Sequence, residues 1–439
     1  MIWNAAVERA PRSALRALQL ERLRRAVTWA CDRVAFYRSA FAEAGIEPAA
    51  IKTLDDLERL PFTRKAHLRE HYPWGLFAVP QRELARVHAS SGSRGKPTVV
   101  GYTRNDLSIW REVMARSLAA AGAEPGQLIQ IAYGYGLFTG GLGFHDGAEC
   151  LGLSVVPVSS GNTLRQILLL QDFRPQHLAC TPSFALHIGE TMREEGMDPR
   201  SVGLRYGFFG AEPWTEGMRR QLEELWGIDA LDFYGLSEII GPGVATECAQ
   251  GRDGLHVNED HFLPEVVDPD TGESLPAGAE GELVLTGLTK QALPMLRYRT
   301  GDVTSLDVEP CRCGRTTVRM ARIKGRTDDM LVIKGVNLYP SQLEAALLTL
   351  PELAPHYQLV VDRRQGFPAI EVHVEPSEAR VREWGGFDSG RPEVLALSLQ
   401  VGELLRAHLG LNPEVAIVPP KTIPRSEGKA VRVVERSST

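Results

Sequence analysis

The segment Ser90–Thr98 contains the residue types that point most directly to chemistry, in the order SSGSRGKPT. Its glycines let the backbone turn tightly and present N–H groups, while hydroxyls and a lysine add donors for phosphate oxygens. It is not the GxxxxGK[ST] nucleotide loop, because Gly92 and Gly95 are too close together and Pro97 follows Lys96. The loop alone leaves a polar surface turn open as the alternative.

Two shorter motifs place an aromatic ring and carboxylates where a nucleotide could bind. Tyr234–Glu238 (YGLSE) follows an apolar run at an expected strand end, which is where ligands bind in open α/β sheets. A tyrosine there can stack on a base, and a glutamate can hold a Mg²⁺ that bridges phosphates. Tyr298–Asp302 (YRTGD) ends in a carboxylate suited to ribose hydroxyls, although an aspartate after glycine is more often turn chemistry.

A third group has the residue types of a structural zinc site. Cys311 and Cys313 flank a single residue, and Cys248 and His256 lie about sixty residues earlier. Together they could form a closed tetrahedral Cys₃His site, with His261 as a reserve ligand. C-x-C is not the usual ligand spacing, so reduced cysteines in a turn remain the alternative.

These motifs need a scaffold, and the chain alternates short apolar runs with helical patterns. Strand–helix alternation of this kind predicts a parallel sheet covered on both faces. The expected strands are 128–134, 153–159, 177–183, 204–210 and 230–235, the expected helices 104–121, 163–172 and 215–226, and a long helix is expected over 12–44. After residue 243 the pattern becomes strand-rich and predicts an antiparallel, barrel-like subdomain.

Beyond residue 326 the pattern changes again to a small α+β domain. Strands are expected within 330–338, 357–361 and 370–374, and helices at 340–349 and 393–409. The expected fold is therefore α/β. It comprises an N-terminal domain over 1–325, with a helical region at 1–75 and the antiparallel subdomain at 244–325, and a C-terminal domain over 326–439.

Composition excludes several classes of protein. A chain of 439 residues is too long for one simple core, and its net charge of −6 gives no electrostatic reason to expect a nucleic acid or an anionic membrane as partner. No apolar run approaches the roughly 18 residues that span a bilayer. The first residues lack the apolar core of a secretory signal, which favours a cytoplasmic enzyme.

The motifs and their order resemble the adenylate-forming acyl-CoA synthetase superfamily, and within it the phenylacetate–CoA ligases. The resemblance covers nearly the whole chain. The segments that carry it are ASSGSRGKPTVVGYTRNDL, AYGYGLFTGGLGFHDGAE, FFGAEPWTE, DFYGLSEIIGPGVATEC, EDHFLPEV, LPMLRYRTGDVT, GRTDDMLVIKGVNLYPSQLE and PRSEGK.

The resemblance implies an ATP- and Mg²⁺-dependent enzyme that forms an acyl-adenylate and then transfers the acyl group to coenzyme A. It implies that Lys429 lies between the substrate carboxylate and the α-phosphate and that Glu238 holds Mg²⁺. For Lys65 two alternatives stay open, a contact with phosphate and a solvated side chain. The C-terminal domain is expected to rotate between half-reactions on a hinge at Asp328.

The nucleotide site carries over position by position from the same resemblance. The implied phosphate cradle is Ser90, Ser91, Gly92, Ser93, Arg94, Gly95 and Lys96. The wall beside the base is Gly210, Ala211, Glu212 and Pro213, with Asp232 near the amino edge of adenine. Phe233, Tyr234 and Gly235 adjoin the base, Tyr234 by stacking, while Asp302 binds the ribose and Arg326 lies near the ribose or phosphate.

An aromatic acid is the expected substrate, against a flat slot formed by Tyr135, Phe138, Gly140, Gly141, Gly241 and Pro242. The chain departs from the family pattern at two places. The usual SGTTGKP loop has Ser93-Arg94, whose guanidinium could strengthen phosphate binding or face solvent. The usual HYGAE block has Asp146 in place of tyrosine, and this departure bears on the substrate. A hydroxylated, amino-substituted or indolic acid is therefore an alternative to phenylacetate.

The thiol acceptor stays open between coenzyme A and the phosphopantetheine of a carrier protein, because both thiols are chemically alike. Members of the family are often dimers, so a homodimer is compatible with the sequence. Reduction by hydride transfer is excluded, because no G-x-G-x-x-G follows the first strand.

Overall fold

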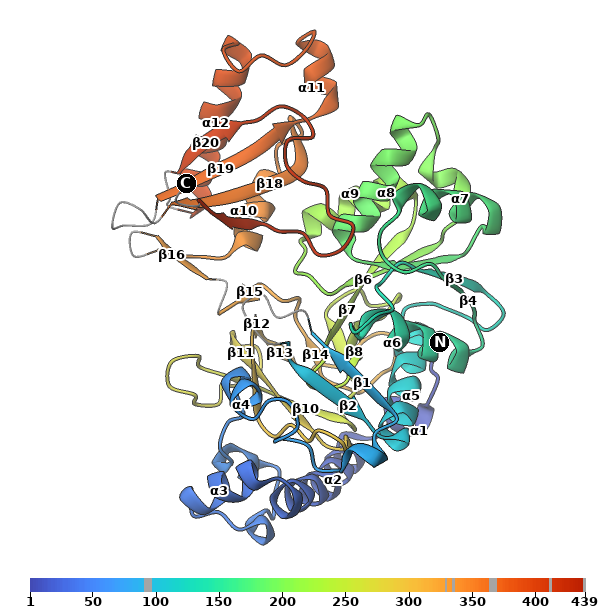
Figure 1. The fold of residues 1–439 in the computed structure, drawn as a ribbon, viewed down its shortest axis with the longest axis vertical. Helices are drawn as coiled ribbons and strands as arrows, with labels where there is room; N and C mark the ends of the chain where they lie inside the picture. Colours follow the sequence, from blue (N-terminus) through green and yellow to red (C-terminus); the bar gives the residue numbers. More distant parts are fainter. Residues whose placement is uncertain (91–96, 328–329, 334–335, 363–368, 410–412, 437–439) are drawn as a thin grey trace. The chain divides into compact units, whose positions relative to one another are not determined.

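A computed structural model describes residues 1–90, 97–327, 330–333, 336–362, 369–409 and 413–436. The chain forms two compact units (Figure 1). Unit 1 comprises Met1–Cys180, Ser201–Ala211 and Ile228–Arg322. Unit 2 comprises Thr181–Arg200, Glu212–Gly227 and Ile323–Thr439, so it takes two helical segments from the middle of the chain as well as the C-terminal part.

A large mixed sheet forms the centre of unit 1, in the order β13-β14-β9-β8-β7-β6-β5-β3-β4. Its parallel strands are β3 (Leu128–Ile131), β4 (Ser154–Pro157), β5 (His177–Cys180), β6 (Tyr206–Gly210) and β7 (Asp229–Leu236). These are the five apolar runs that predicted a parallel sheet. The sheet continues with antiparallel strands, which are β8 (Gly241–Glu247), β9 (Leu255–Val257), β13 (Leu306–Asp307) and β14 (Arg319–Met320).

Two smaller sheets complete unit 1. A hairpin of β1 (Arg86–Ala89) and β2 (Val99–Tyr102) brackets the glycine-rich loop. The antiparallel strands β10 (Phe262–Val267), β11 (Gly281–Gly287) and β12 (Tyr298–Thr304) form the other sheet. The antiparallel pairing expected after residue 243 is therefore present, but its strands divide between this sheet and the large one.

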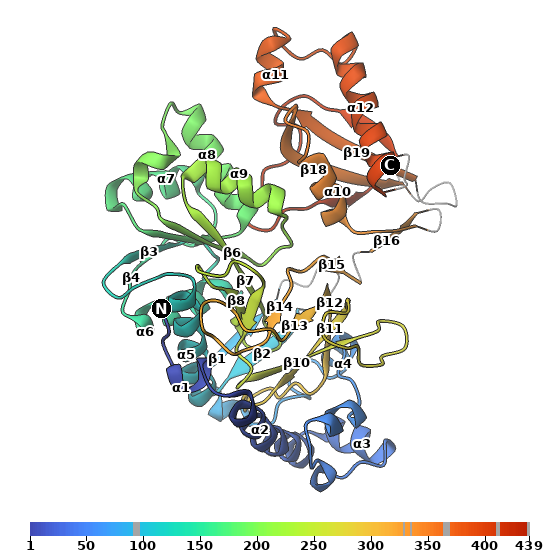
Figure 2. The same cartoon turned by 180° about the vertical axis from the view of Figure 1, so that it is seen from behind.

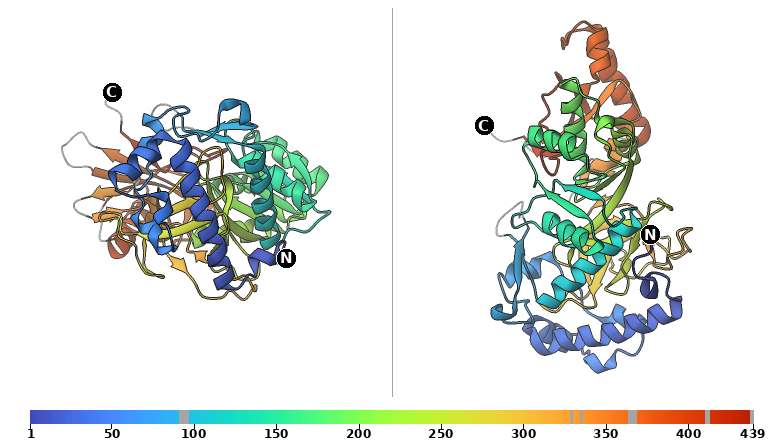
Figure 3. Two further views of the ribbon diagram at one scale, coloured as in Figure 1. Left: turned by 90° about the horizontal axis from the view of Figure 1, so that it is seen from below. Right: turned by 90° about the vertical axis from the view of Figure 1, so that its right-hand side faces the viewer.

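The helices of unit 1 are α1 (Ala5–Glu8), α2 (Arg12–Arg33), α3 (Ala35–Glu43), α4 (Lys65–Glu70), α5 (Arg104–Ala120), α6 (Gly140–Leu151) and α7 (Thr163–Phe173). Short 3₁₀ turns occur at Pro48–Ala50, Asp55–Arg59, Gln81–Glu83 and Pro199–Val202. The helix expected over 12–44 is not continuous, because Val34 is extended, with φ −115° and ψ 115°. Helix α2 runs along one end of unit 1 (Figure 3).

Helix α5 shows how local sequence fixes the scaffold. It begins at a capping box, in which the Thr103 hydroxyl accepts from the Asp106 amide and the Asp106 carboxylate accepts from the Thr103 amide. Trp110, Val113 and Met114 form its buried face. This face packs against α6 and β8 (Figure 2), so the helix supports the strands that follow the YGLSE motif.

Unit 2 has a sheet in the order β20-β19-β18-β21, with helices packed on it. Its elements are α8 (Pro182–Glu194), α9 (Glu216–Trp226), β15 (Gly325–Arg326), β16 (Leu331–Ile333), β17 (Val336–Leu338), α10 (Pro340–Leu347), β18 (Leu353–Asp362), β19 (Ala369–Pro376), α11 (Glu378–Glu383), α12 (Pro392–Leu409), β20 (Glu414–Ile417) and β21 (Val433–Glu435). Leu343, Leu359, Val372, Val401 and Leu405 form the centre of its core. In the described part of the chain, no helix is long and apolar enough to cross a membrane.

Candidate active site

Tyr234 and Asp302 come together although 68 residues separate them in the chain. The Tyr234 hydroxyl, near the end of β7, donates to Asp302 Oδ2 on β12 at 2.6 Å. Asp302 is buried, and its amide donates to the Thr300 hydroxyl at 3.0 Å. A hydrogen bond to an ionised carboxylate is short and strong, so the ring expected beside adenine orients the carboxylate expected beside ribose.

Glu238 lies in the turn that follows β7 and is buried. The Tyr298 hydroxyl donates to its Oε1 at 3.3 Å, and the ammonium of Lys290 donates to its main-chain carbonyl at 3.3 Å. The neighbouring Ser237 hydroxyl pairs with that of Thr139 at 3.0 Å. The turn is therefore fixed through both main-chain and side-chain atoms, and its carboxylate is the type of ligand that Mg²⁺ prefers.

Lys290 is a residue of this site that the sequence analysis missed. Burial lowers the pKa of its ammonium to about 8, against the opposing charges of Asp106 and Glu238. The ammonium lies 4.5 Å from the ring centroid of Tyr102, a cation–π contact. Asp106 holds the backbone beside it by accepting from the amides of Gln291 at 2.7 Å and Ala292 at 3.0 Å. The sequence feature that could have indicated it is a single lysine within an apolar stretch.

The phosphate cradle is described only at its edge. The amide of Ser90 donates to the carbonyl of Thr98 at 2.9 Å, which closes the β1–β2 hairpin around the loop. Ser91, Gly92, Ser93, Arg94, Gly95 and Lys96 lie outside the described residues, as does the expected hinge residue Asp328.

Lys65 is the first residue of α4, and its side chain is half-buried. Two residues earlier, Thr63 makes two main-chain hydrogen bonds to the start of β12. Its amide donates to the carbonyl of Arg297, and its carbonyl accepts from the amide of Arg299, each at 3.0 Å. Since β12 also carries Asp302, the backbone places Lys65 next to the strand that provides the expected ribose ligand.

The expected base wall in unit 1 follows β6. Gly210 ends this strand, and Ala211 has a positive φ of 69°, so the chain turns sharply there. Asp232 on β7 is buried, and its carboxylate lies 3.4 Å from the guanidinium of Arg322, while its amide donates to Glu247 at 2.8 Å. Arg322 therefore competes for the carboxylate that the resemblance places near adenine.

The residues of the expected aryl slot pack closely against the buried Trp110 and against their own main chain. The indole Nε1 donates to the carbonyl of Pro242 at 2.8 Å. Gly241, at φ 105°, lies so close to the indole that a Cβ would overlap it. A Cβ on Gly141 would lie 2.6 Å from the carbonyl oxygen of Gly134. Larger residues are thus excluded where α6 begins and where β8 starts.

Tyr135 at this slot is tied to helix α6. Its hydroxyl pairs with His145 Nδ1 at 3.2 Å, and His145 Nε2 lies 3.2 Å from a Glu149 oxygen. Burial, with the charges of Asp146 and Glu149, raises the pKa of Tyr135 above its usual value. The Tyr135 hydroxyl is therefore neutral and is held by the protein.

Asp146, which replaces the family's tyrosine, is neutralised by two arginines. Its carboxylate lies 2.7 Å from Arg86 and 3.7 Å from Arg111. Asp146 and Arg86 are largely buried, so the aspartate forms a structural ion pair between β1 and α6. The carboxylate is therefore paired with arginines, while the expectation that the loss of the tyrosine and the gain of this carboxylate alter the substrate stays a prediction.

Cys248, His256, Cys311 and Cys313 gather into one buried cluster, with ligand atoms all within 4.8 Å of one another. The Cys248 and Cys311 sulfurs lie 3.7 Å apart, and Cys313 Sγ lies 3.4 Å from His256 Nε2. A tetrahedral ion with Zn–S bonds of about 2.3 Å and Zn–N bonds of about 2.0 Å requires separations of about 3.8 and 3.5 Å. The described geometry matches both values.

The surroundings of this cluster also fit a metal site. His256 Nδ1 lies 3.1 Å from the hydroxyl of Thr317, which orients the ring so that Nε2 faces the sulfurs. The amide of Gly251 donates to Cys248 Sγ at 3.1 Å. A closed arrangement of this type would connect the turn after β8 to the segment between β13 and β14.

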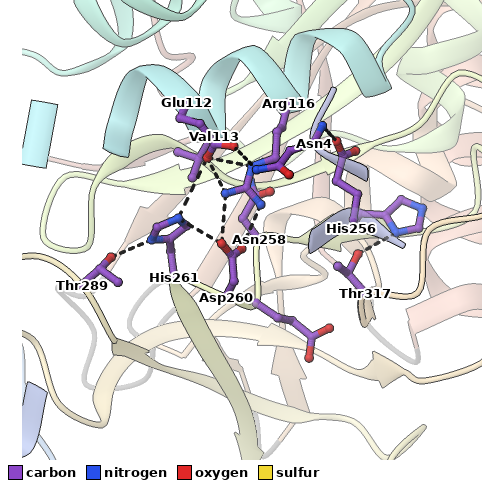
Figure 4. Close-up of polar contacts among 12 residues, drawn as sticks. Asn4, Glu112, Val113, Arg116, His256, Asn258, Asp260, His261, Thr289 and Thr317 are labelled. Atoms are coloured by element: carbon purple, nitrogen blue, oxygen red, sulfur yellow. Dashed lines mark hydrogen bonds and ion pairs between the residues drawn. The ribbon is translucent and has the colours of Figure 1, made fainter. Parts of the chain in front are cut away.

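His261, the reserve ligand, belongs to a different group of residues. Its Nε2 lies 3.0 Å from Asp260 and its Nδ1 2.8 Å from the hydroxyl of Thr289 (Figure 4). Two guanidinium nitrogens of Arg116 on α5 donate to the two carboxylate oxygens of Asp260 at 2.9 and 3.1 Å. Burial opposes ionisation of Asp260, but His261 and Arg116 lower its pKa below the usual value. His261 is therefore engaged in an ion network that joins α5 to the start of β10.

Lys429 lies in unit 2, where its side chain is exposed. Glu212, which the resemblance assigned to the base wall, also lies in unit 2, and its carboxylate accepts from the amides of Ser183 at 2.9 Å and Ala430 at 2.8 Å. Pro213 and Arg326 belong to the same unit.

Comparison with known proteins places the chain among enzymes that bind AMP. The family model described as AMP-binding enzyme matches residues 78–290, and that of the AMP-binding enzyme C-terminal domain matches residues 335–437. The phenylacetate–coenzyme A ligase of Thermus thermophilus is 55% identical over 441 residues, covering 99% of each chain. That of Escherichia coli is 47% identical over 430 residues, covering 98% of this chain and 96% of its own.

A solved structure of 2-hydroxyisobutyryl-CoA ligase, in a postadenylation state with 2-HIB-AMP, has a TM-score of 0.92 and 31% identity. It covers 99% of this chain and 92% of its own. The same enzyme with 2-HIB-AMP and CoA, in the thioesterification state, has a TM-score of 0.73 at 32% identity and the same coverage. By sequence and by fold, this chain belongs to the phenylacetate–CoA ligase family of adenylate-forming enzymes.

Proposed function

We propose that this protein activates an aromatic carboxylic acid with ATP and transfers the acyl group to coenzyme A, with phenylacetate as the first substrate to test. The carboxylate oxygen attacks the α-phosphorus of ATP, the bond to the bridging oxygen breaks, and pyrophosphate leaves. The sulfur of coenzyme A then attacks the acyl carbon, its proton is lost to solvent, and AMP leaves with the former carboxylate oxygen.

One observation carries this proposal. The Tyr234–Asp302 hydrogen bond joins the motifs expected beside adenine and ribose, on β7 and β12 of two different sheets. The chain that holds them matches the AMP-binding enzyme family model. Glu238, fixed by Tyr298 and Lys290, would hold Mg²⁺, which neutralises phosphate charge as pyrophosphate departs. Lys429 would supply a second positive charge at the α-phosphate.

The substrate slot favours a flat aromatic acid. The glycines at the start of α6 and β8 let the backbone pack closely against Trp110, Phe138 and Gly134, and the acid is proposed to lie beside Tyr135. Because Asp146 is neutralised by Arg86 and Arg111, an amino-substituted acid gains nothing from it. Asp146 therefore gives no reason to prefer an amino-substituted acid over unsubstituted phenylacetate in this proposal.

Pyrophosphate release from Mg²⁺-ATP, measured over a panel of aryl acids with and without coenzyme A, tests the function. We expect turnover with phenylacetate, and sustained turnover only when coenzyme A is present. A carrier-protein acceptor predicts a single burst of pyrophosphate with coenzyme A present, because the adenylate would not be discharged. Absence of release with every acid, by a protein that binds AMP, contradicts the proposal. We expect the reaction to occur in the cytoplasm, where ATP and coenzyme A are available.

We infer further that the Cys248–His256–Cys311–Cys313 cluster holds a structural Zn²⁺. The support is the match of the sulfur and nitrogen separations to tetrahedral Zn–S and Zn–N bonds, together with the Thr317 contact to His256. Such an ion would brace the antiparallel strands and take no part in the reaction.

Metal analysis of the purified protein checks the zinc inference. We expect about one zinc per chain, retained in Cys150→Ser and lost in Cys313→Ser, since Cys150 is exposed and lies outside the cluster. A chelator should lower the melting temperature of the wild-type protein and leave that of Cys313→Ser unchanged. Equal zinc contents in the two variants would contradict the inference.

A further inference from the structure

The main chain around Lys429 is held by side chains on both sides of that residue. The hydroxyls of Thr181 and Ser183 donate to the carbonyl of Gly428 at 2.8 and 3.1 Å. The Glu212 carboxylate accepts from the amide of Ala430 at 2.8 Å. The carbonyl and the amide that flank Lys429 therefore have partners from outside their own segment, all within unit 2.

The three partners are themselves fixed. Thr181 is the N-cap of α8, where its hydroxyl also accepts from the amide of Phe184 at 3.3 Å. The second oxygen of Glu212 accepts from the amide of Ser183 at 2.9 Å, so the carboxylate bridges the start of α8 and Ala430. Thr181 and Ser183 are buried, so these bonds are shielded from water.

The base of the segment is anchored separately. Glu375, buried at the end of β19, accepts from the amides of Lys421 at 2.9 Å and Ile423 at 2.7 Å and pairs with Arg425 at 2.7 Å. Ser426 donates to the carbonyl of Lys429 at 2.7 Å. The segment that carries Lys429 is thus held at two places. Glu375 on β19 binds its start, and α8 and Glu212 bind the residues on either side of Lys429.

We propose that Thr181, Ser183 and Glu212 are positioning residues that set Lys429 for adenylation. The inference rests on the proposed role of Lys429 and adds the residues through which its backbone is placed. Adenylation requires a charge at a defined point beside the α-phosphate, and a misplaced group loses much of its effect. Attack by a thiol on a finished adenylate has no such requirement for Lys429.

Separate assays of the two half-reactions test this inference in the full-length protein. Adenylation is followed by acid-dependent exchange of labelled pyrophosphate into ATP, and thioester formation by coenzyme A consumption with synthetic phenylacetyl-AMP. We expect Thr181→Val/Ser183→Ala to lower the exchange rate at saturating ATP about tenfold, from two lost hydrogen bonds. Its thioester formation should stay within about twofold of wild type.

Controls separate positioning from general damage. Thr191→Val removes a hydroxyl that bonds the His187 carbonyl within α8, and it should leave both half-reactions unchanged. Thr181→Ser keeps the donor and should retain exchange. If the double variant does not fold, Ser183→Ala alone, which keeps the N-cap, can be used. It should lower the exchange rate about threefold and leave thioester formation unchanged.

The outcomes distinguish this inference from the function it rests on. Equal losses in both half-reactions, or no loss in either, would overturn the positioning role while leaving the enzyme a ligase. Loss of exchange in Lys429→Ala together with normal exchange in the double variant would overturn it too. Absence of exchange in the wild-type protein would instead refute the proposed function.

Discussion

Replacing Tyr234 with phenylalanine removes one hydroxyl and keeps the ring that is expected to stack on adenine. The lost bond is the 2.6 Å donation to Asp302. A hydrogen bond to a buried carboxylate contributes about 1.5–3 kcal/mol. If 1.5 kcal/mol of this holds the carboxylate against other rotamers, the ratio of the oriented to the other rotamers falls about tenfold. We therefore expect the KM for ATP to rise by up to about tenfold, with a smaller change in kcat.

The assay is pyrophosphate release at varied ATP, with AMP affinity measured by calorimetry. Tyr135→Phe is the matched control, because its hydroxyl bonds His145 and not a nucleotide residue, so its KM for ATP should match wild type. With 2′,3′-dideoxy-ATP, which lacks the hydroxyls that Asp302 is expected to bind, the penalty of Tyr234→Phe should nearly vanish. A full penalty with the dideoxy nucleotide would refute the reasoning that the tyrosine acts through Asp302.

Three further predictions concern the scaffold. Burial and the charge of Arg205 lower the pKa of His177 to about 3, so the stability that is present above pH 6.5 is lost as the pH falls. Urea titration should show about 2 kcal/mol less unfolding free energy at pH 5 than at pH 7. His177→Gln should not show this loss. Asp106→Ala leaves three amides without their acceptor and should lower the unfolding free energy by about 3 kcal/mol, measured in urea at pH 7. Asp146→Asn should lower the melting temperature, because it breaks the ion pair with Arg86. Since the charge of Asp146 is already paired, the order of preference over a panel of unsubstituted and amino-substituted aryl acids should not change, and a reversed order would contradict this.

Much of the fold follows from the sequence, because buried parallel strands are short apolar runs that end in turn residues. Residues 128–134 and 204–210 predicted β3 and β6 for this reason. The helix over 12–44 was predicted too long, because residue type does not reveal that Val34 has an extended backbone and a buried side chain. Intrinsic propensity is a weak prior when tertiary contacts oppose it.

The site was predictable as a set of motifs but not as a set of contacts. The YGLSE motif spans the end of β7 and the YRTGD motif begins β12, yet no pattern indicates that the Tyr234 hydroxyl binds Asp302 or that Arg86 neutralises Asp146. Lys290 was missed because its role depends on burial and on the Glu238 carbonyl, neither of which its neighbours in sequence reveal. The cysteine cluster was found, because ligand types are few and distinctive.

Transfer of labelled oxygen tests the central claim most directly. In the proposed reaction an oxygen of the acid becomes bonded to the α-phosphorus and stays with AMP when the thiol attacks the acyl carbon. With phenylacetate labelled in both carboxylate oxygens by ¹⁸O, mass spectrometry should find one ¹⁸O in each AMP and none in pyrophosphate. Unlabelled AMP, or label in inorganic phosphate, would show that activation does not pass through an acyl-adenylate and would contradict the account.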